Sequence, residues 1–204
     1  MKKWYNVVRD KENEISGSPG NEKPVRHQCY HFCKEQNMSE YDWGEQGMEI
    51  NKAGFDDLEK ILQLQYIAYQ SEAELFGSRD IPPLKQTLDE LIEEYHTGIF
   101  LKMVSDDGTI IGSVRAKENG GTVYIGKLMV HPDCRGHGYG SSLLSEMETC
   151  FPGKRYELFT STRSKDNIRL YRRLGYREFS RKAVNDELVF VYMEKIVCME
   201  KTGA

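Results

Sequence analysis

The segment Gly126–Gly140 constrains the fold more than any other part of the sequence, because a strand-like run leads into a glycine-rich turn and then a helix. The glycines Gly136, Gly138 and Gly140 allow the main chain to approach a ligand closely. The unpaired N–H groups and the positive dipole end of the following helix favour an anion such as phosphate. We therefore expect the turn to bind an anion. The dinucleotide fingerprint is absent, since Ser141 replaces its third glycine, and no Gly-Lys-Ser/Thr closes a nucleotide P-loop.

Apolar periodicity predicts the elements around this turn. The expected helices cover residues 56–69, 82–98, 138–151 and 165–174. The expected strands cover residues 49–53, 99–104, 109–117, 122–130, 155–161, 176–181 and 187–196. This order predicts an α/β (α+β) fold with three layers, in which helices cover both faces of a mixed, mostly antiparallel sheet.

The chain is expected to consist of one domain with a polar extension. Residues 1–47 lack periodicity and contain the turn-forming run Ser16–Asn21, so we expect a poorly ordered extension, a domain at 48–197 and a short tail at 198–204. In the extension, His and Cys alternate at His27, Cys29, His31 and Cys33. A closed zinc site usually takes ligands from two separated pairs, so no metal site is predicted.

A second patterned block lies at Asn167–Tyr176. Its residues Asn167, Leu170, Tyr171 and Leu174 recur at helical spacing, so two leucines anchor a helix face that also carries an amide and a phenol. Such a face is typical of a binding or catalytic site. The alternative is a tyrosine whose hydroxyl is simply bonded within the core.

Together the two blocks resemble the GNAT superfamily of acetyl-coenzyme A dependent N-acetyltransferases. Its signature, Arg/Gln-x-x-Gly-x-Gly/Ala after a Leu-x-Val-x-Pro strand, is matched by Leu128–Pro132 and Arg135–Gly140. Its second block, Asn-x-x-x-Tyr-x-Lys/Arg-x-Gly-Phe/Tyr, is similar to Asn167–Tyr176. The resemblance covers residues 48–196 and implies acetyl-CoA as co-substrate. It also implies direct transfer to an amine without a covalent acetyl-enzyme.

The resemblance implies a role for each motif residue. Main-chain groups of Leu128 and Val130 would run beside the pantetheine, and the Leu128 or Met129 region would donate to the thioester oxygen. Asn167 would contact the pantetheine amide, and Tyr171 would protonate the departing thiolate as the general acid. Main-chain N–H groups of the turn would hold the pyrophosphate, and two arginines would meet the nucleotide phosphates. These coenzyme-binding residues are Arg135, Gly136, His137, Gly138, Tyr139 and Gly140, with Arg172 and Arg173.

The general base is less evident from the sequence. Many relatives carry a glutamate on the strand before the pyrophosphate turn, where this sequence has Tyr124, Gly126 and Lys127. A water chain or a carboxylate from another element must then accept the proton of the amine. Glu157 on the neighbouring strand is the first candidate, with a surface role as its alternative, and Tyr124 and His131 are further candidates.

Charge is distributed unevenly along the chain, although the net charge is only -4. Residues 154–182 contain ten basic and three acidic side chains, which fits coenzyme phosphates. Residues 56–94 contain ten acidic and three basic side chains, which fits a cationic acceptor, because the first two helices edge the acceptor cleft in this superfamily. Both stretches could instead be solvated helix faces.

We therefore expect a soluble, cytoplasmic acetyl-CoA dependent N-acetyltransferase that acts on a small cationic amine or a protein amino group. The five cysteines, an odd number at irregular spacing, fit reduced thiols. A membrane partner is not expected without a long apolar run, nor is nucleic acid, given the negative charge and the lack of a stacking motif. A homodimer is possible. The alternative function is a non-catalytic acyl-CoA binding or regulatory protein, for which the missing glutamate is the motive.

Overall fold

The computed structural model describes residues 48–185 and 188–197, so the expected extension at 1–47 and tail at 198–204, including the His27–Cys33 alternation, lie outside the described residues. The helices are α3 (Leu58–Ala68), α4 (Gln70–Phe76), α5 (Leu88–Tyr95), α6 (Tyr139–Thr149) and α7 (Lys165–Arg173). The strands are β1 (Glu49–Lys52), β2 (Ile99–Val104), β3 (Ile110–Asn119), β4 (Thr122–Val130), β5 (Arg155–Ser161), β6 (Arg177–Ala183) and β7 (Val189–Ile196). Short 3₁₀ turns are formed by Phe55–Asp57 (η1), Pro82–Leu84 (η2) and Pro132–Cys134 (η3).

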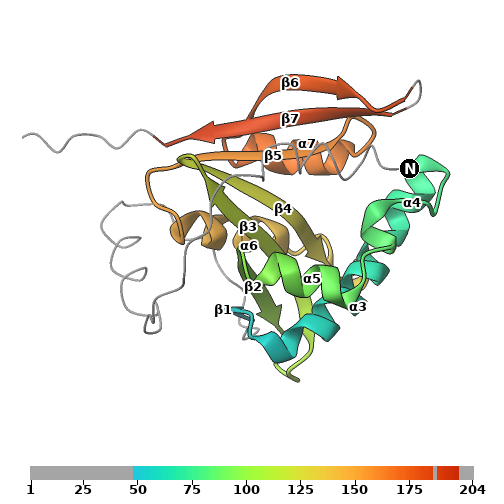
Figure 1. Ribbon diagram of the computed structural model, residues 1–204, viewed down its shortest axis with the longest axis vertical. Coiled ribbons are helices and arrows are strands. Elements are labelled where there is room, and N and C mark those ends of the chain that lie inside the picture. Colours follow the sequence, from blue (N-terminus) through green and yellow to red (C-terminus); the bar gives the residue numbers. More distant parts are fainter. Residues whose placement is uncertain (1–47, 186–187, 198–204) are drawn as a thin grey trace, which may run out of the picture. The chain divides into compact units, whose positions relative to one another are not determined.

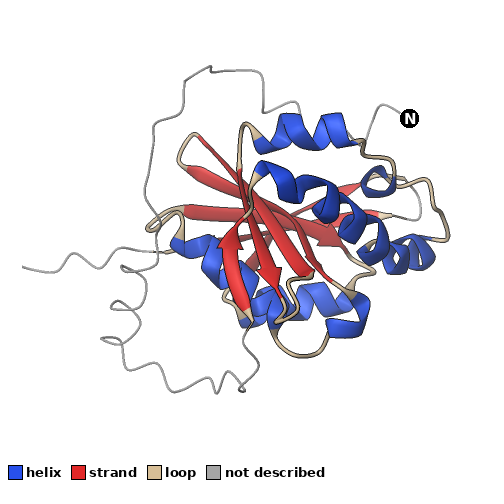
Figure 2. Ribbon diagram, turned by 90° about the horizontal axis from the view of Figure 1, so that it is seen from below, coloured by secondary structure: helices blue, strands red, loops and turns tan. Residues whose placement is uncertain are grey.

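The strands form one sheet in the order β1-β2-β3-β4-β5-β7-β6 (Figure 1). Only β4 and β5 run parallel, and every other neighbouring pair is antiparallel. Helices lie on both sides of the sheet, as Figure 2 shows. The predicted three-layer α/β fold on a mixed, mostly antiparallel sheet is confirmed.

Each central strand contributes to two hydrophobic cores, because alternate side chains of a strand point to opposite faces. On β2, Leu101 and Met103 pack in the core that contains α6 and Tyr171 of α7. Phe100, which directly precedes Leu101, packs on the other face, in the core that contains α3 and Leu91 of α5. The two helix pairs are thereby held on opposite faces of the same sheet.

Two helix boundaries differ from the sequence prediction. The first predicted helix continues past Tyr69 as α4, which ends only at Gly77 in the left-handed conformation. The second does not begin at Pro82, since Pro82–Leu84 forms only a 3₁₀ turn. It begins after Thr87, whose side chain accepts a hydrogen bond from the Glu90 main chain while the Glu90 carboxylate accepts one from Thr87. This capping box satisfies two N–H groups that a start at the prolines would leave unpaired.

The strands β4 and β5 pair only where they begin. The parallel register joins Thr122–Tyr124 to Arg155–Glu157, although β4 continues to Val130 and β5 to Ser161. Figure 1 shows the two strands separating towards their carboxyl ends. Beyond Tyr124, the edge of β4 that faces β5 therefore has no strand partner among the described residues. Such an edge can receive an extended ligand as an added strand.

A bulge interrupts β4 at the same level. The register with β3 shifts between Ser113, opposite Met129, and Arg115, opposite Gly126. Lys127 and Leu128 of β4 therefore lie opposite the single residue Val114, so β4 has one extra residue. Lys127 has a φ of 50°, and no other non-glycine residue of the described chain has a positive φ. Side chains rarely adopt this conformation, and bulges that enforce it often re-aim a side chain next to an active site.

Candidate active site

The glycine-rich turn follows the open end of β4. Gly136 and Gly138 have φ values of 87° and 83°, which favour glycine, and Gly138 is the N-cap of the 11-residue helix α6. A Cβ atom added to either glycine would meet no atom within 4 Å, so the space in front of the turn is open. The exposed main chain at the start of α6 is thus suited to bind an anion.

The side chain of Arg135 ties this turn to the junction of α3 and α4. Its guanidinium donates to the Ala68 carbonyl oxygen at 2.9 Å and to the Ser71 hydroxyl at 3.0 Å. Both acceptors flank Tyr69, the joint between α3 and α4. Arg135 therefore fixes the position of the first residues of α4 relative to the turn.

Asn167 and Tyr171 lie one turn apart on α7, beside the end of β4. A Cβ atom on Gly140 would lie 3.5 Å from Leu170 and 3.9 Å from Val130, so α7, β4 and the start of α6 meet here. The Asn167 amide donates to Thr160 of β5 at 3.4 Å and to the Glu72 carboxylate of α4 at 3.3 Å. The predicted face of α7 thus connects β5 with α4.

Tyr171 is buried, with 7% of its surface exposed. Burial, and then the negative charge of Glu72, raise the pKa of Tyr171 well above its ordinary value, so its hydroxyl stays protonated at neutral pH. Among the described residues the hydroxyl has no hydrogen-bond partner, in contrast to Tyr176, which donates to Glu148 at 2.8 Å. A core tyrosine with a bonded hydroxyl therefore describes Tyr176 but not Tyr171.

Three further side chains converge on the same place: Tyr69, Glu72 and Lys127. The sequence did not identify them as site residues. The Lys127 ammonium lies 5.4 Å from the ring centroid of Tyr69. Burial, and then the charge of Arg115, lower the pKa of Lys127 to about 8, against the opposing effect of Glu94 and Glu72. Burial raises the pKa of Glu72, although Lys127, the Asn167 hydrogen bond and Arg135 act in the opposite direction.

The comparisons with known proteins agree with this geometry. A sequence profile of the acetyltransferase (GNAT) family matches residues 56–176, which is more than half of the chain. This chain belongs to the GNAT family of acetyltransferases. The predicted activity, acetyl transfer from acetyl-CoA, is thereby confirmed at the level of the family.

Solved structures of GNAT enzymes have the same fold. The PaiA N-acetyltransferase of Thermoplasma acidophilum, solved with coenzyme A, is 18% identical with a TM-score of 0.62, covering 74% of this chain and 99% of its own. The ribosomal-protein-S18-alanine N-acetyltransferase of Escherichia coli is 14% identical with a TM-score of 0.63, covering 77% and 98%. A phosphinothricin acetyltransferase of Sinorhizobium meliloti, solved with acetyl-CoA, is 16% identical with a TM-score of 0.60, covering 77% and 92%. No curated protein sequence matches the chain significantly.

The remaining predicted coenzyme residues of this GNAT acetyltransferase lie around the same end of β4. Leu128 and Val130 are half-buried on the part of β4 that does not pair with β5, and Met129 packs into the core of α3 and α5. Arg172 and Arg173 are exposed in the last turn of α7. None of these positions conflicts with the predicted roles, which stay predictions.

The predicted base Glu157 lies where β4 and β5 still pair, opposite Tyr124. It is buried, and its carboxylate accepts a hydrogen bond from Arg155 at 2.9 Å. Arg155 also binds Glu194 at 2.7 Å, so one guanidinium neutralises two carboxylates. The surface alternative for Glu157 is wrong, since the side chain is buried. The His131 ring accepts a hydrogen bond from the Asp133 main chain at 3.4 Å.

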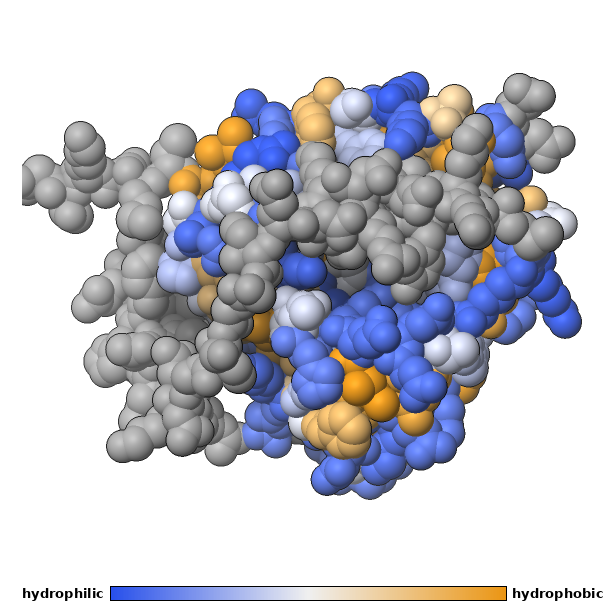
Figure 3. Space-filling view, viewed as in Figure 1, coloured by the Kyte–Doolittle hydropathy of each residue, from blue (hydrophilic) through white to orange (hydrophobic). Residues whose placement is uncertain are grey.

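The acidic stretch 56–94 divides into two groups in the structure. Six of its ten acidic residues are exposed and fit a solvated face: Asp56, Glu59, Glu74, Asp80, Asp89 and Glu93. Figure 3 shows that the face carrying α3 and α5 is mainly hydrophilic around a small apolar patch. Only Glu72 and Glu94 act electrostatically on Lys127 and Tyr69. Glu94 is bound to the buried Arg115 at 2.5 Å, whereas Glu72 forms no ion pair with a described residue.

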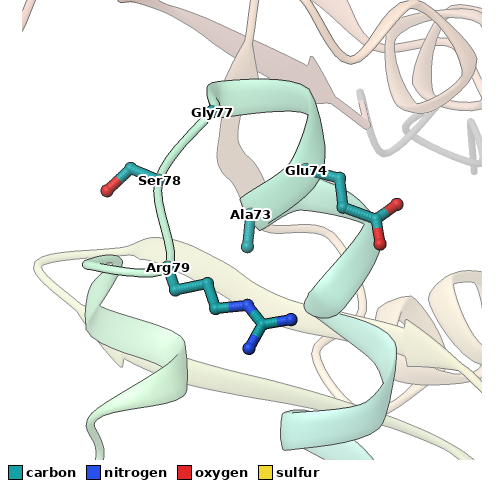
Figure 4. Close-up of a pocket in the computed structure, with 5 residues that line it drawn as sticks. All are labelled: Ala73, Glu74, Gly77, Ser78 and Arg79. Carbon is teal, nitrogen blue, oxygen red and sulfur yellow. The ribbon is translucent and has the colours of Figure 1, made fainter.

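A shallow hollow of about 220 Å³ lies at the carboxyl-terminal end of α4. It is lined by Ala73, Glu74, Gly77, Ser78 and Arg79, which come from the last turn of α4 and the following loop (Figure 4). None of the predicted site residues lines it. Over residues 48–185 and 188–197, no cluster of His, Cys, Asp or Glu could hold a metal ion. No helix in this part of the chain has the length and apolar character that crossing a bilayer requires.

Replacement of Lys127 by methionine is expected to stabilise the protein at pH 7, because methionine keeps the length of the side chain without its charge. The pKa of Lys127 is about 8 in the folded protein and 10.5 ordinarily, so the unfolded chain binds more protons between these values. Stability of the wild type should therefore rise as pH increases from about 8 to 10.5. Below pH 8 the full cost, at most roughly 3 kcal/mol, is present.

Urea denaturation of both proteins between pH 7 and pH 10.5 measures this effect. The difference in unfolding free energy should be largest at pH 7 and should shrink as pH approaches 10.5. Parallel curves for wild type and Lys127→Met would show that the Lys127 ammonium is not desolvated.

Proposed function

We propose that this protein transfers the acetyl group of acetyl-CoA directly to a primary amine, either on a small cationic molecule or on a protein. The observation that supports the proposal most is the meeting of three features at the end of β4. These are the open strand edge, the glycine-rich turn and the Tyr171 hydroxyl, which has no hydrogen bond to a described residue. Each supplies one part that the reaction needs: a bed for the pantetheine, an anion cradle and a proton donor.

The coenzyme would lie along the end of β4. The main chain of Leu128 and Val130 would pair with the pantetheine amides, and the bulge at Lys127 and Leu128 would turn an N–H towards the thioester oxygen. The turn from Arg135 to Gly140 would bind the pyrophosphate, and the absence of any atom within 4 Å of an added Cβ at Gly138 supports this. Arg172 and Arg173 are exposed and follow shortly after Leu170, which lies beside Gly140 of the turn. They would meet further phosphates of the coenzyme.

The chemistry would use Tyr171 as the proton donor. When the amine nitrogen bonds to the acetyl carbon, the carbon–sulfur bond breaks and the thiolate takes the proton of Tyr171. Because burial keeps the pKa of Tyr171 high, the hydroxyl holds its proton until a thiolate forms next to it. Asn167 would exchange its contact with Glu72 or Thr160 for the pantetheine amide.

The acceptor is proposed only as a class. One solved relative is named for an alanine of a ribosomal protein and another for phosphinothricin, so the fold accommodates both protein and small-molecule acceptors. A partly buried carboxylate next to Tyr171 supports an acceptor that arrives as an ammonium ion. A homodimer and a cytoplasmic location stay predictions from the sequence.

The proposal is tested by two measurements on the wild-type protein. Saturating acetyl-CoA should raise the melting temperature, because a ligand at about 100 times its Kd stabilises the native state by about 2.7 kcal/mol. A panel of polyamines, aminoglycosides, amino acids and peptide N-termini should then yield at least one amine that accelerates thiol release from acetyl-CoA.

Each failure has its own meaning. No thermal stabilisation by acetyl-CoA would refute the coenzyme site. Stabilisation without thiol release for any amine would favour the non-catalytic acyl-CoA binding protein, for which the tyrosine and lysine at the usual glutamate position of β4 are the motive.

A further inference from the structure

Glu72 is the third residue after Tyr69, the joint between α3 and α4. We propose that the Glu72 carboxylate receives the ammonium group of the acceptor and removes its proton before attack. This inference rests on the proposed function and adds to it the general base that the sequence left open.

The first support is the position of the carboxylate. Its Oε1 accepts a hydrogen bond from Asn167 at 3.3 Å, and Tyr171 follows one turn later on the same face of α7. The charge of Glu72 raises the pKa of Tyr171, which places the two side chains within electrostatic reach of each other. The groups that would accept and donate protons thus lie on the same side of the end of β4.

The second support is the set of partners that Glu72 lacks. Among the described residues, Glu72 forms no ion pair, and its one hydrogen bond is to the neutral Asn167 amide. Three other carboxylates are instead bound to cations: Glu157 to Arg155, Glu94 to Arg115 and Glu148 to Lys195. Because a buried carboxylate without a cationic partner is costly, it is usually retained where a ligand supplies that partner.

The third support is how firmly Glu72 is held. Arg135 donates to Ala68 and Ser71, which precede Glu72 in the chain, and Ala73 directly after it is buried. The carboxylate therefore has a fixed origin, although no cation holds its end. Binding of coenzyme to the turn that carries Arg135 would reinforce this position.

Several charged or titratable groups face Glu72 and influence its pH dependence. Lys127 of β4 and Arg135 of the turn favour the ionised carboxylate, and so does the hydrogen bond from Asn167 of α7. Burial opposes it. Tyr69 at the joint and Tyr171 of α7 stay neutral at physiological pH because burial raises the pKa of both. Glu72 therefore remains a carboxylate with a raised pKa, closer to the working pH than an exposed glutamate.

The proposed proton transfers balance as follows in the complete reaction. Glu72 takes one proton from the ammonium ion, and the free amine then forms the nitrogen–carbon bond as the carbon–sulfur bond breaks. Tyr171 gives its proton to the sulfur and regains one from the nitrogen, which becomes the amide. Glu72 finally releases its proton to water, so the net products are the acetylated amine, coenzyme A and one proton.

The test compares Glu72→Gln with Glu74→Gln, an exposed glutamate two residues along the same helix. The acceptor is the amine of the panel that the wild type acetylates fastest, and activity is measured as thiol release across pH. At neutral pH, Glu72→Gln should lose about 10²–10⁴-fold in kcat/KM, as expected for removal of a general base, and Glu74→Gln should be unaffected. Thermal stabilisation by acetyl-CoA should be the same in all three proteins.

The pH profile separates proton removal from a structural role. The defect of Glu72→Gln should shrink as pH approaches the pKa of the acceptor amine, because solution then supplies the free amine. A loss of equal size at every pH, or weaker acetyl-CoA stabilisation, would overturn the inference, as would full activity. Glu72→Asp keeps a carboxylate and should retain the wild-type shape of the profile at a reduced rate, which keeps the test valid if the glutamine variant fails to fold. No turnover of any amine by the wild type would instead refute the proposed function itself.

Discussion

Replacement of Tyr171 by phenylalanine is expected to lower kcat for amine acetylation by about 10²–10⁴-fold, the usual contribution of a positioned general acid. The variant removes only the hydroxyl, and the ring can stay packed beside Tyr176 at a centroid distance of 6.1 Å. No hydrogen bond to a described residue is lost, so stability should change little. The pKa of Tyr171 is raised, so the activity of the wild type should not fall through tyrosine ionisation at any pH up to 10.

Tyr176→Phe is the matched control. Tyr176 is also buried, and its ring lies beside the ring of Tyr171. Its hydroxyl, however, donates to Glu148, which lies outside the candidate active site. This variant should lose about 1 kcal/mol of stability with kcat unchanged. Thiol-release kinetics and urea denaturation of both variants give the comparison. A kcat of Tyr171→Phe within a factor of two or so of the wild type would exclude Tyr171 as the proton donor.

Replacement of Gly138 by aspartate is expected to weaken acetyl-CoA binding far more than replacement by asparagine. Gly138 has a φ of 83°, and an added side chain would extend into open space in front of the turn. Aspartate and asparagine have the same size and tolerate this conformation similarly, so the backbone strain cancels between them. A carboxylate about 4 Å from a phosphate charge is unfavourable by about 1 kcal/mol in water and about 4 kcal/mol near a protein surface.

The expected difference in Kd between Gly138→Asp and Gly138→Asn is therefore about 5- to 1,000-fold. Calorimetric titration with acetyl-CoA measures it directly. The difference should decrease at high salt, because screening weakens the interaction between the two negative charges. Equal Kd values for the two variants would mean that no anionic part of the coenzyme lies near residue 138.

Most elements of this fold could be predicted from local sequence patterns. The strands β2, β4 and β5 have their predicted bounds, because side-chain alternation and adjacent turns are encoded within a few residues. The helix boundaries at Tyr69 and Thr87 were predicted incorrectly. At Thr87, a side-chain capping box begins the helix, whereas the prolines had predicted an earlier start. At Tyr69, the apolar stripe gave no indication that α4 follows α3.

The candidate site could be predicted only on its coenzyme side. The glycine-rich turn and the Asn167–Tyr176 block are contiguous motifs, so their residue types and spacing carry the information. Glu72 and Lys127 belong to no such motif. In the sequence, Glu72 is one of ten acidic residues in the stretch 56–94, and Lys127 lies where many relatives carry a glutamate. The bulge that turns Lys127 towards Tyr69 depends on the register of β4 with β3.

The sequence by itself determined the family, the order of the elements and the main chain that would bind the coenzyme, because each depends on neighbours within a turn or a strand. Only the tertiary structure decided which carboxylate lies within electrostatic reach of Tyr171. Glu72 and Asn167 are 95 residues apart in the chain, and they meet because β4 and β5 separate and α4 and α7 come together beside the gap. Such a contact follows from the topology of the whole sheet, which no local periodicity records.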